Sequence, residues 1–243
     1  MTDPVLIYFN SSMGNSLGLT MNDARSTENR IKEVALELFA TKGFAGTGIR
    51  EIAQGAKLTT ASLYHYVRNK DELLFKMLEE TIGGLLSGGL SIIRTVSRPE
   101  EQLACLVQFH VQAHAFKKRE SAVLDVELRR LKTSAREQVF RLADSYEDIW
   151  RTVIEEGVAS GIFNDVDPRD ARLALINMCT GVNIWYSSTG KITPQEYGLR
   201  FTKLAFAKLN ARRAGRPCRV ETLELPDPSW ITALALDPPP VMG

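Results

Sequence analysis

The sequence has few cysteines and histidines, and it lacks the apolar runs of membrane proteins. Its 243 residues include three cysteines and three histidines. Cys105, Cys179 and Cys218 lie far apart and form no Cys-x-x-Cys pair, which excludes a disulfide framework and a zinc finger. We expect Cys105 and Cys179 to be buried thiols. The longest apolar stretch, residues 171–186, is interrupted by an arginine, two asparagines and a threonine, so it is too polar to span a membrane.

The sequence also lacks a strong charge of one sign. Lys and Arg number 30 against 29 Asp and Glu, for a formal net charge of +1. This excludes a wholly basic nucleic-acid coat protein but not a local basic face. No basic segment precedes an apolar one near residue 1, as a secretory signal requires. We therefore expect a cytoplasmic protein with no membrane partner.

Common enzyme motifs are absent as well. The sequence shows no Walker loop, no Gly-x-Gly-x-x-Gly, no Ser-His-Asp order and no motif of paired acids, so we expect neither an enzyme nor a cofactor. His110 and His114 have the i, i+4 spacing that can hold a metal on one helical face. The nearest acids, Glu120 and Asp125, come after that helix. We expect two half-buried histidines and no metal, and a metal-binding helical-bundle enzyme is the alternative.

What is present is one helical pattern after another, without sustained strand alternation, so the predicted fold class is all-α. Gly43 closes the first pattern, and Thr59 and Asn69 are the expected N-caps of the third and fourth helices. The glycine pairs at 83–84 and 88–89 predict bending or fraying of the fourth. Ser97 and Ser134 are expected to cap later helices. Pro168 and Pro194 follow cap residues and open the last two helices, which are expected over 168–187 and 194–210.

The two ends of the chain differ from this pattern. Residues 1–26 are polar and predict a flexible arm. Residues 211–243 hold six of the ten prolines and begin with four closely spaced arginines. They predict an extended or disordered Pro/Arg-rich tail, in which Trp230, Ile231 and Leu234 are the residues able to dock.

Residues 49–56 and 60–66 form two short helices joined by a tight turn, which is helix-turn-helix spacing. In such a pair the second helix enters the major groove of DNA. Its first residues, Thr60, Ala61 and Ser62, are small enough for a close approach to base edges. Leu63 and Val67 face inward at i, i+4. The polar and aromatic side chains that follow can reach phosphates or bases.

Residues 28–76 resemble the N-terminal domain of TetR-family transcriptional regulators. The matching pieces are A-x-x-L-F-x-x-x-G-F at 35–44, I-R-E-I-A at 49–53 and L-Y-x-Y-V-x-N-K-x-E-L-L at 63–74. The resemblance implies a helix-turn-helix domain over 27–74 that binds double-stranded operator DNA. The family positions that contact DNA correspond here to Arg50, Thr59, Thr60, Ser62, Tyr64, His65, Tyr66 and Lys70.

This chain departs from the family pattern at two positions. Gly48 stands where a Ser or Thr often caps the second helix, so the side-chain cap is expected to be weak or shifted. Lys57 stands where the turn usually has glycine, and a left-handed lysine is strained by about 1 kcal/mol. Tyr66 has two open roles, a contact with DNA or a place inside the domain.

The resemblance implies that residues 75–210 form a helical domain that binds a small effector and forms the homodimer. Its last two helices are expected to carry the dimer interface, on faces that include Ala171, Leu175, Met178, Cys179, Val182, Tyr197, Phe201, Leu204, Ala205 and Leu209. Glu127, Arg129 and Arg130 form a charged cluster, either a solvated face or an anion site. Many large apolar residues, expected to point inward, predict a cavity: Leu103, Leu106, Phe109, Phe116, Val123 and Phe140.

Residues 183–197, with Asn183-Ile184-Trp185-Tyr186, resemble a TetR branch that controls fatty-acid and steroid catabolism. We therefore predict a repressor released from its operator by an apolar effector, with an acyl-CoA thioester as the specific candidate. The predicted ligand-binding residues are Phe109, Arg129, Arg130 and Trp185. An activator, or a regulator without any small ligand, is the alternative.

Overall fold

The computed structural model describes residues 21–131, 133–164 and 166–240, and only the backbone of 21–24, 124, 125 and 129. These residues are almost entirely helical, so the predicted all-α class is confirmed. The expected arm over 1–26 lies outside the described residues up to position 20, and from Met21 onward the chain is already helical. None of the described helices is both long and apolar enough to cross a bilayer.

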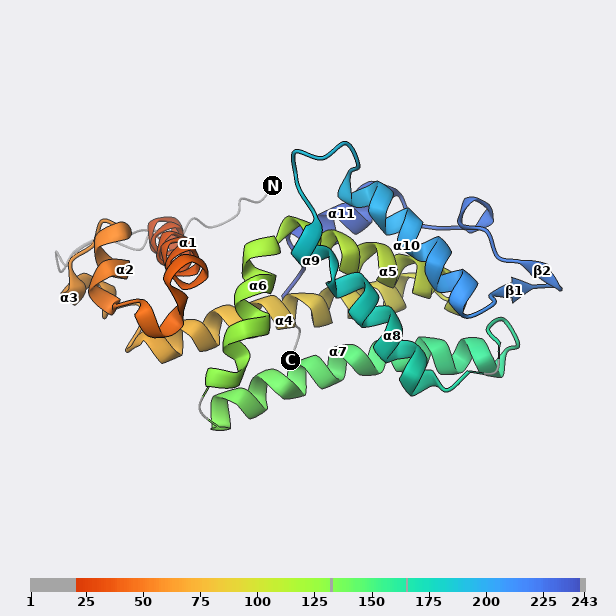
Figure 1. The fold of residues 1–243 in the computed structure, drawn as a ribbon, viewed down its shortest axis with the longest axis horizontal. Helices are drawn as coiled ribbons and strands as arrows, with labels where there is room; N and C mark the ends of the chain where they lie inside the picture. The colour runs from red at the N-terminus through yellow and green to blue at the C-terminus, as the bar shows by residue number, and fades with distance from the viewer. Residues whose placement is uncertain (1–20, 132, 165, 241–243) are drawn as a thin grey trace, which may run out of the picture.

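Three helices form the N-terminal domain at one end of the molecule (Figure 1), α1 (Met21–Gly46), α2 (Ile49–Gly55) and α3 (Thr60–Leu63). The regular helix of α1 ends at Gly43, where φ is +72°, as the sequence predicts. Buried apolar side chains from all three helices form one core with the first turns of α4. Val123, Leu131 and Val139 join this core from the second domain, so the two domains are packed directly against each other.

The second domain is built around α5. Its elements are α4 (Lys70–Thr95), α5 (Pro99–Phe116), α6 (Lys118–Glu127), the 3-10 turn η1 (Leu128–Arg130), α7 (Thr133–Ala159), α8 (Pro168–Thr180), α9 (Val182–Trp185) and α10 (Pro194–Lys208). Nearly every residue of α5 is buried, and α4, α7, α8 and α10 pack around it. Since α4 also begins inside the N-terminal core, it joins the two domains (Figure 1).

The caps explain where most helices begin. Thr59, Asn69, Asp167 and Thr193 each accept a backbone N–H with a side-chain oxygen, as predicted. Ser97 and Ser134 do not cap helices, because α5 begins at Pro99 with Arg98 before it and α7 already begins at Thr133. The helix expected over 168–187 is two helices, since α8 ends at Thr180 and the short α9 follows Gly181.

The glycines of α4 do not fray the helix, which is continuous from residue 70 to 95. They allow close packing instead. A Cβ at Gly88 would lie 2.2 Å from the ring of Phe109, and one at Gly89 would lie 3.1 Å from the ring of Tyr146. The fraying prediction was wrong because burial against α5 and α7 outweighs the low helix propensity of glycine.

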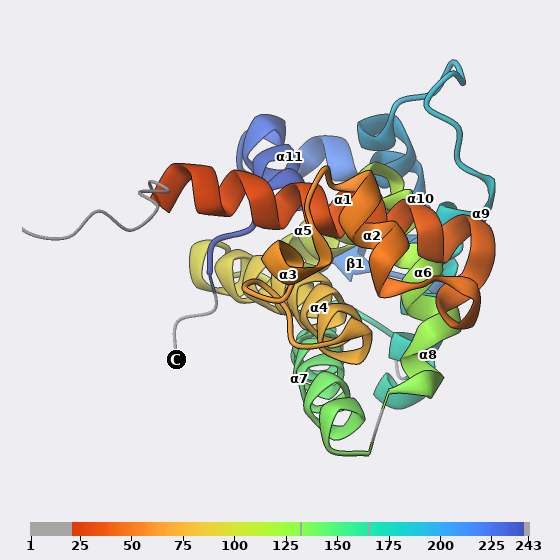
Figure 2. The same cartoon turned by 90° about the vertical axis from the view of Figure 1, so that its left-hand side faces the viewer.

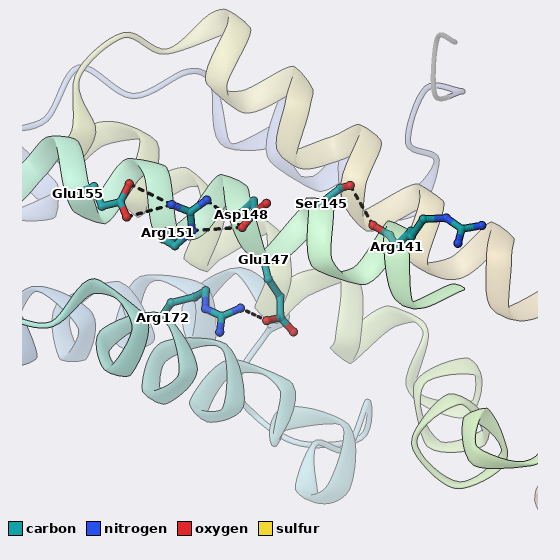
Figure 3. A network of polar contacts seen from close by, with 7 residues as sticks. All are labelled: Arg141, Ser145, Glu147, Asp148, Arg151, Glu155 and Arg172. Carbon is teal, nitrogen blue, oxygen red and sulfur yellow. Dashed lines mark hydrogen bonds and ion pairs between the residues drawn. The ribbon is translucent and has the colours of Figure 1, made fainter. Parts of the chain in front are cut away.

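Helix α8 is also held to α7 by charge (Figure 3). Arg172 of α8 pairs with Glu147 of α7. On the outer side of α7, Arg151 pairs with Asp148 and Glu155 at 3.0 Å each. These last pairs are exposed, lie within α7 and contribute little to stability. The buried residues Ala171, Leu175 and Cys179 hold α8 in place together with the Arg172–Glu147 pair.

Residues 209–240, which follow α10, form turns and regular elements, and this corrects the expectation of an extended or disordered tail over that range. They form an antiparallel hairpin of β1 (Arg212–Arg213) and β2 (Arg216–Pro217), the 3-10 turn η2 (Val220–Thr222) and α11 (Pro228–Leu236). Helix α11 packs on α5 and α4, with Ile231 and Leu234 buried. The prediction from proline content was wrong because these apolar residues bury enough surface to order the proline-rich chain around them.

Candidate DNA-binding surface and effector cavity

The turn between α2 and α3 places the N-terminus of α3 at the end of the molecule (Figure 2). Lys57 has φ of +57°, the left-handed conformation that the sequence predicts. The hydroxyl of Thr59 accepts the N–H of Ser62 at 3.0 Å and lies 2.8 Å from the hydroxyl of Ser62. No side chain caps α2 at Gly48, as expected, and Glu51 supplies only the reciprocal bond by accepting the N–H of Gly48 at 2.8 Å. The turn is therefore fixed by hydrogen bonds within the motif.

The eight residues predicted to contact DNA fall into two groups. Arg50, Thr59, Tyr64 and His65 are exposed, and half of the Tyr64 surface is open to solvent. Thr60, Ser62, Tyr66 and Lys70 are partly buried. Tyr66 packs against the N-terminal core, which is the inward alternative left open by the sequence. The exposed group gives this surface a guanidinium, an imidazole and two hydroxyls able to meet phosphates or base edges.

Lys70 is occupied by bonds within the protein. Its ammonium donates to the carbonyl oxygens of Phe44 and Thr47, each at 2.6 Å. It also lies 4.3 Å from the centre of the Phe44 ring. These contacts tie the start of α4 to the loop after α1, so the lysine has a structural role whether or not it also approaches a phosphate.

Glu127 connects the two domains, which corrects the prediction of a solvated charged face. Its side chain is buried, one oxygen accepts the N–H of Phe44 at 3.1 Å, and the other lies 2.6 Å from Arg130. Arg130 itself is half exposed, and the side chain of Arg129 lies outside the described residues. The carboxylate therefore joins the end of α6 to the end of α1.

The residues predicted to bind the effector do not come together. Phe109 is fully buried against α4. Arg130 is paired with Glu127, and Trp185 is half exposed on α9, where its ring lies 4.9 Å from that of Tyr197. Phe116 and Phe140, expected to point inward, are 36% and 44% exposed. Both occupy outward-facing positions on their helices, a placement that hydrophobicity alone does not reveal.

A narrow cavity does lie beside Phe109. Its walls come from α4, α5, α6 and the chain after α10, with Leu85, Phe109, His114, Ser121 and Leu234 among the lining residues. The space amounts to about 310 Å³ including its open mouth, and it is so narrow that it holds hardly more than one water molecule. Lys117 is the cation that lines it.

The two central histidines have different surroundings, and both are almost completely buried. One ring nitrogen of His110 lies 2.9 Å from the hydroxyl of Tyr146, and the other lies 2.9 Å from that of Thr180. His114 lines the cavity, and neither of its ring nitrogens has a hydrogen-bond partner. Burial lowers the pKa of His114 to about 4 and that of His110 well below its usual range, so both are neutral at pH 7. Across the described residues, no three His, Cys, Asp or Glu side chains gather as a metal site requires.

Sequence reasoning missed His114 as a cavity residue, together with Ser121 and Leu234. The i, i+4 spacing of His110 and His114 drew attention to this position, but the spacing suggested only a metal site and not a cavity. The sequence marked Leu234 as a residue able to dock, but it did not indicate that Leu234 would dock at the cavity.

The fold and this surface define a helix-turn-helix protein with a helical second domain. Residues 31–77 match the family described as bacterial regulatory proteins, tetR family, and residues 96–209 match the tetracyclin repressor-like C-terminal domain. The chain belongs to the TetR family and is a DNA-binding transcriptional regulator.

Three known proteins are similar to it. The transcriptional repressor KstR2 of Mycobacterium tuberculosis is 25% identical over 178 residues, 72% of this chain and 89% of its own length. The fatty acid metabolism regulator protein of Bacillus subtilis is 26% identical over 153 residues, 63% of this chain and 79% of its own length. The structure of AibR with isovaleryl coenzyme A and operator DNA has a TM-score of 0.67 at 22% identity, covering 73% of this chain and 97% of AibR.

Proposed function

We propose that the protein is a homodimeric repressor that binds operator DNA and is released by an apolar effector, with an acyl-CoA thioester as the specific candidate. The observation that carries the proposal is the exposed surface of Arg50, Tyr64 and His65 beside the slim first turn of α3. In this proposal residues 27–74 bind DNA, and residues 75–210 bind the effector and form the dimer. The protein acts in the cytoplasm and catalyses no reaction.

Exposed apolar side chains on the last helices support the dimer. Leu173 on α8, Ile184 on α9, and Leu199 and Leu204 on α10 are each at least 40% exposed. Most residues that the sequence predicted for this face, such as Leu175 and the other buried residues of α8, instead pack inside the protomer. An apolar face of this kind is favourable to bury against its twin in a two-fold dimer.

Two lines of support favour an acyl-CoA effector. The cavity walls are mainly apolar and include a cation at Lys117, which suits an acyl chain with phosphates outside it. KstR2 is a repressor, the Bacillus subtilis relative is a regulator of fatty acid metabolism, and AibR binds isovaleryl coenzyme A together with operator DNA. Lys117 is better placed than Arg130 to meet CoA phosphates, because Arg130 is paired with Glu127.

The mechanism that we propose uses α6 as the connection. One end of α6 contributes Ser121 to the cavity, and the other end holds the loop of Phe44 through Glu127. An effector that displaces α6 therefore moves the N-terminal domain and changes the spacing of the two α3 helices in the dimer. A ligand shifts such an equilibrium only by its differential affinity for the two states, about 5.5 kcal/mol for a change from 99:1 to 1:99.

The test is release of a labelled operator duplex by a panel of acyl-CoA esters, measured by fluorescence anisotropy. Free CoA and the free acids are the controls. We expect release by esters of one range of acyl size and none by free CoA, because the acyl group supplies the apolar contacts. Release only by hydrophilic or cationic compounds would contradict the apolar effector. Binding of operator without release by any compound would favour a ligand-independent regulator.

A further inference from the structure

Residues 212–240, here called the C-terminal extension, lie beyond the family domains. The match to the C-terminal domain ends at residue 209. AibR is covered over 97% of its length by only 73% of this chain, so part of this chain has no counterpart there. The extension is therefore a structural addition whose role the family does not supply.

The C-terminal extension is fastened to the effector domain by specific contacts. The N–H of Glu224 donates to the carboxylate of Glu101 at 3.2 Å, and the hydroxyl of Thr232 donates to the side-chain oxygen of Gln112 at 2.8 Å. At its far end the hydroxyl of Ser87 on α4 donates to the carbonyl of Pro239. The extension thus runs across α5 and ends on α4, and it reaches the cavity on the way.

Leu234, Ala235 and Pro238 of the C-terminal extension line the cavity opposite Phe109 and His114. The approach is closest at Gly84, where a Cβ would lie 2.9 Å from Cγ of Pro238. A ligand of more than a few atoms does not fit the space as it stands. A larger ligand can enter only if one wall of the cavity moves. The walls from α4 and α5 are long helices within the core, whereas residues 237–240 have no regular structure, so residues 237–240 are the wall that moves.

His114 indicates what the cavity accepts. It is 8% exposed and both ring nitrogens lack a partner, whereas both nitrogens of neighbouring His110 are hydrogen-bonded. A neutral imidazole offers one donor and one acceptor. Leaving both unused in an apolar cavity is costly, and a ligand carbonyl that accepts the ring N–H, or a hydroxyl that pairs with either nitrogen, would lower that cost.

We propose that the C-terminal extension is the lid of the effector site, and that His114 hydrogen-bonds a neutral carbonyl or hydroxyl of the apolar molecule held beneath it. This inference rests on the proposed function for the identity of the site. It adds to that function an entry route for the effector, past residues 234–240, and a hydrogen-bonding partner for the effector, His114. The carbonyl of an acyl thioester meets the requirement set by His114.

The test locks the lid with an engineered disulfide. Cβ of a residue at 84 would lie 4.0 Å from Cβ of Pro238, within the range of about 3.5–4.5 Å found in disulfides. The full chain carries Gly84→Cys and Pro238→Cys with Cys218→Ser, since Cys218 is the one native cysteine not fully buried. The probe is Nile red, a neutral apolar dye with a carbonyl, and its affinity is measured by fluorescence with and without reductant. Each single-cysteine variant is the matched control.

We expect dye affinity to be at least tenfold lower in the oxidised protein, to recover on reduction, and to be insensitive to reductant in the single-cysteine controls. Equal affinity in both states overturns the lid, as does no binding in the reduced state or failure of the two cysteines to pair. Operator binding by the same protein reports separately on the proposed function. A protein that binds operator but not the dye would refute the lid alone.

His114 is tested by two substitutions, His114→Leu and His114→Gln. The leucine variant should weaken dye binding several-fold and raise Tm, because the unpaired imidazole is gone. The glutamine variant, which keeps a donor and an acceptor, should restore much of the affinity. A lower Tm with unchanged dye affinity in the leucine variant would show a merely structural histidine and overturn the anchor.

Discussion

Two residues of the DNA-binding domain that the family motif treats alike differ in their surroundings. Tyr64 is half exposed and has no tertiary role in the core, whereas the ammonium of Lys70 holds the carbonyls of Phe44 and Thr47. Removal of the Lys70 ammonium would leave these two carbonyl oxygens without their donor, which lowers the free energy of unfolding. Loss of an exposed contact appears only in binding. Substitution of Lys70 should therefore change the stability of the protein, and substitution of Tyr64 should change its affinity for DNA.

We expect Lys70→Met to lower the free energy of unfolding by about 2 kcal/mol, because two carbonyls lose a charged donor. Urea denaturation measures it, with Arg151→Met as the control, since Arg151 makes only exposed pairs within α7. Tyr64→Ala should leave the urea midpoint unchanged and weaken operator binding by about 1–3 kcal/mol. Unchanged stability in Lys70→Met would contradict the structural role of the lysine.

At the scale of elements, α6 connects the cavity with the N-terminal domain, as α4 also does through Thr81 at the cavity and Leu78 in the N-terminal core. Ser121 lies in the first turn of α6, a ten-residue helix, and Glu127 is its last residue. Lys118 also fixes its start by donating to the carbonyl of Tyr186 at 2.6 Å. The helix therefore contacts the effector domain near its start and Phe44 at its end, so a shift of α6 would move both contacts.

We expect Glu127→Ala to uncouple the two domains, because Phe44 loses the acceptor of its N–H. The protein should bind the effector with unchanged affinity but require several times more of it to release operator DNA. Calorimetry measures the first quantity and anisotropy the second. Glu155→Ala removes an exposed carboxylate on α7 and serves as the control. An unchanged release curve in Glu127→Ala would refute the coupling through this helix.

The elements that the sequence predicted well are those fixed by local chemistry. Thr59, Asn69, Asp167 and Thr193 cap their helices in the structure, and Gly43 and Lys57 adopt the positive φ expected of their positions. These features depend on a few neighbouring residues, so the sequence carries them directly. The helix-turn-helix motif was predictable for the same reason.

The cavity beside Phe109 could not be predicted from the sequence, because its walls come from distant parts of the chain. Phe109 meets Gly88 of α4, and residues 234–238 return to cover His114. Proline content suggested disorder for that segment, but Ile231 and Leu234 supply the burial that orders it. The ion pair of Arg130 with Glu127 could not be predicted from the sequence either, because it depends on how α6 packs against α1.

At the scale of the whole molecule, α8, α9 and α10 each expose large apolar side chains that burial in a dimer interface would remove from water. Leu204 is 54% exposed and Ile184 80% exposed. Contact between two such faces would place two α3 helices on one duplex, and a two-fold protein reads a palindrome with half-sites about one helical turn or its multiples apart.

Leu204→Asp should convert the protein to a monomer without disturbing its fold, because the side chain is mostly in solvent and a charge is costly to bury in an interface. Sedimentation should show twice the chain mass for the native protein and the chain mass for the variant. Unchanged circular dichroism verifies the fold. A native monomer at micromolar concentration would contradict the dimer.

The central claim, a dimeric regulator that reads DNA through α3, is tested most directly by selection from a pool of random duplex DNA. The native protein should enrich a palindrome after several rounds, and Leu204→Asp should enrich none, because one half-site gives too little affinity. Tyr64→Ala should bind the selected palindrome about 5- to 150-fold more weakly. Enrichment of no sequence by the native protein, or of a palindrome that Tyr64→Ala binds equally well, would contradict the account.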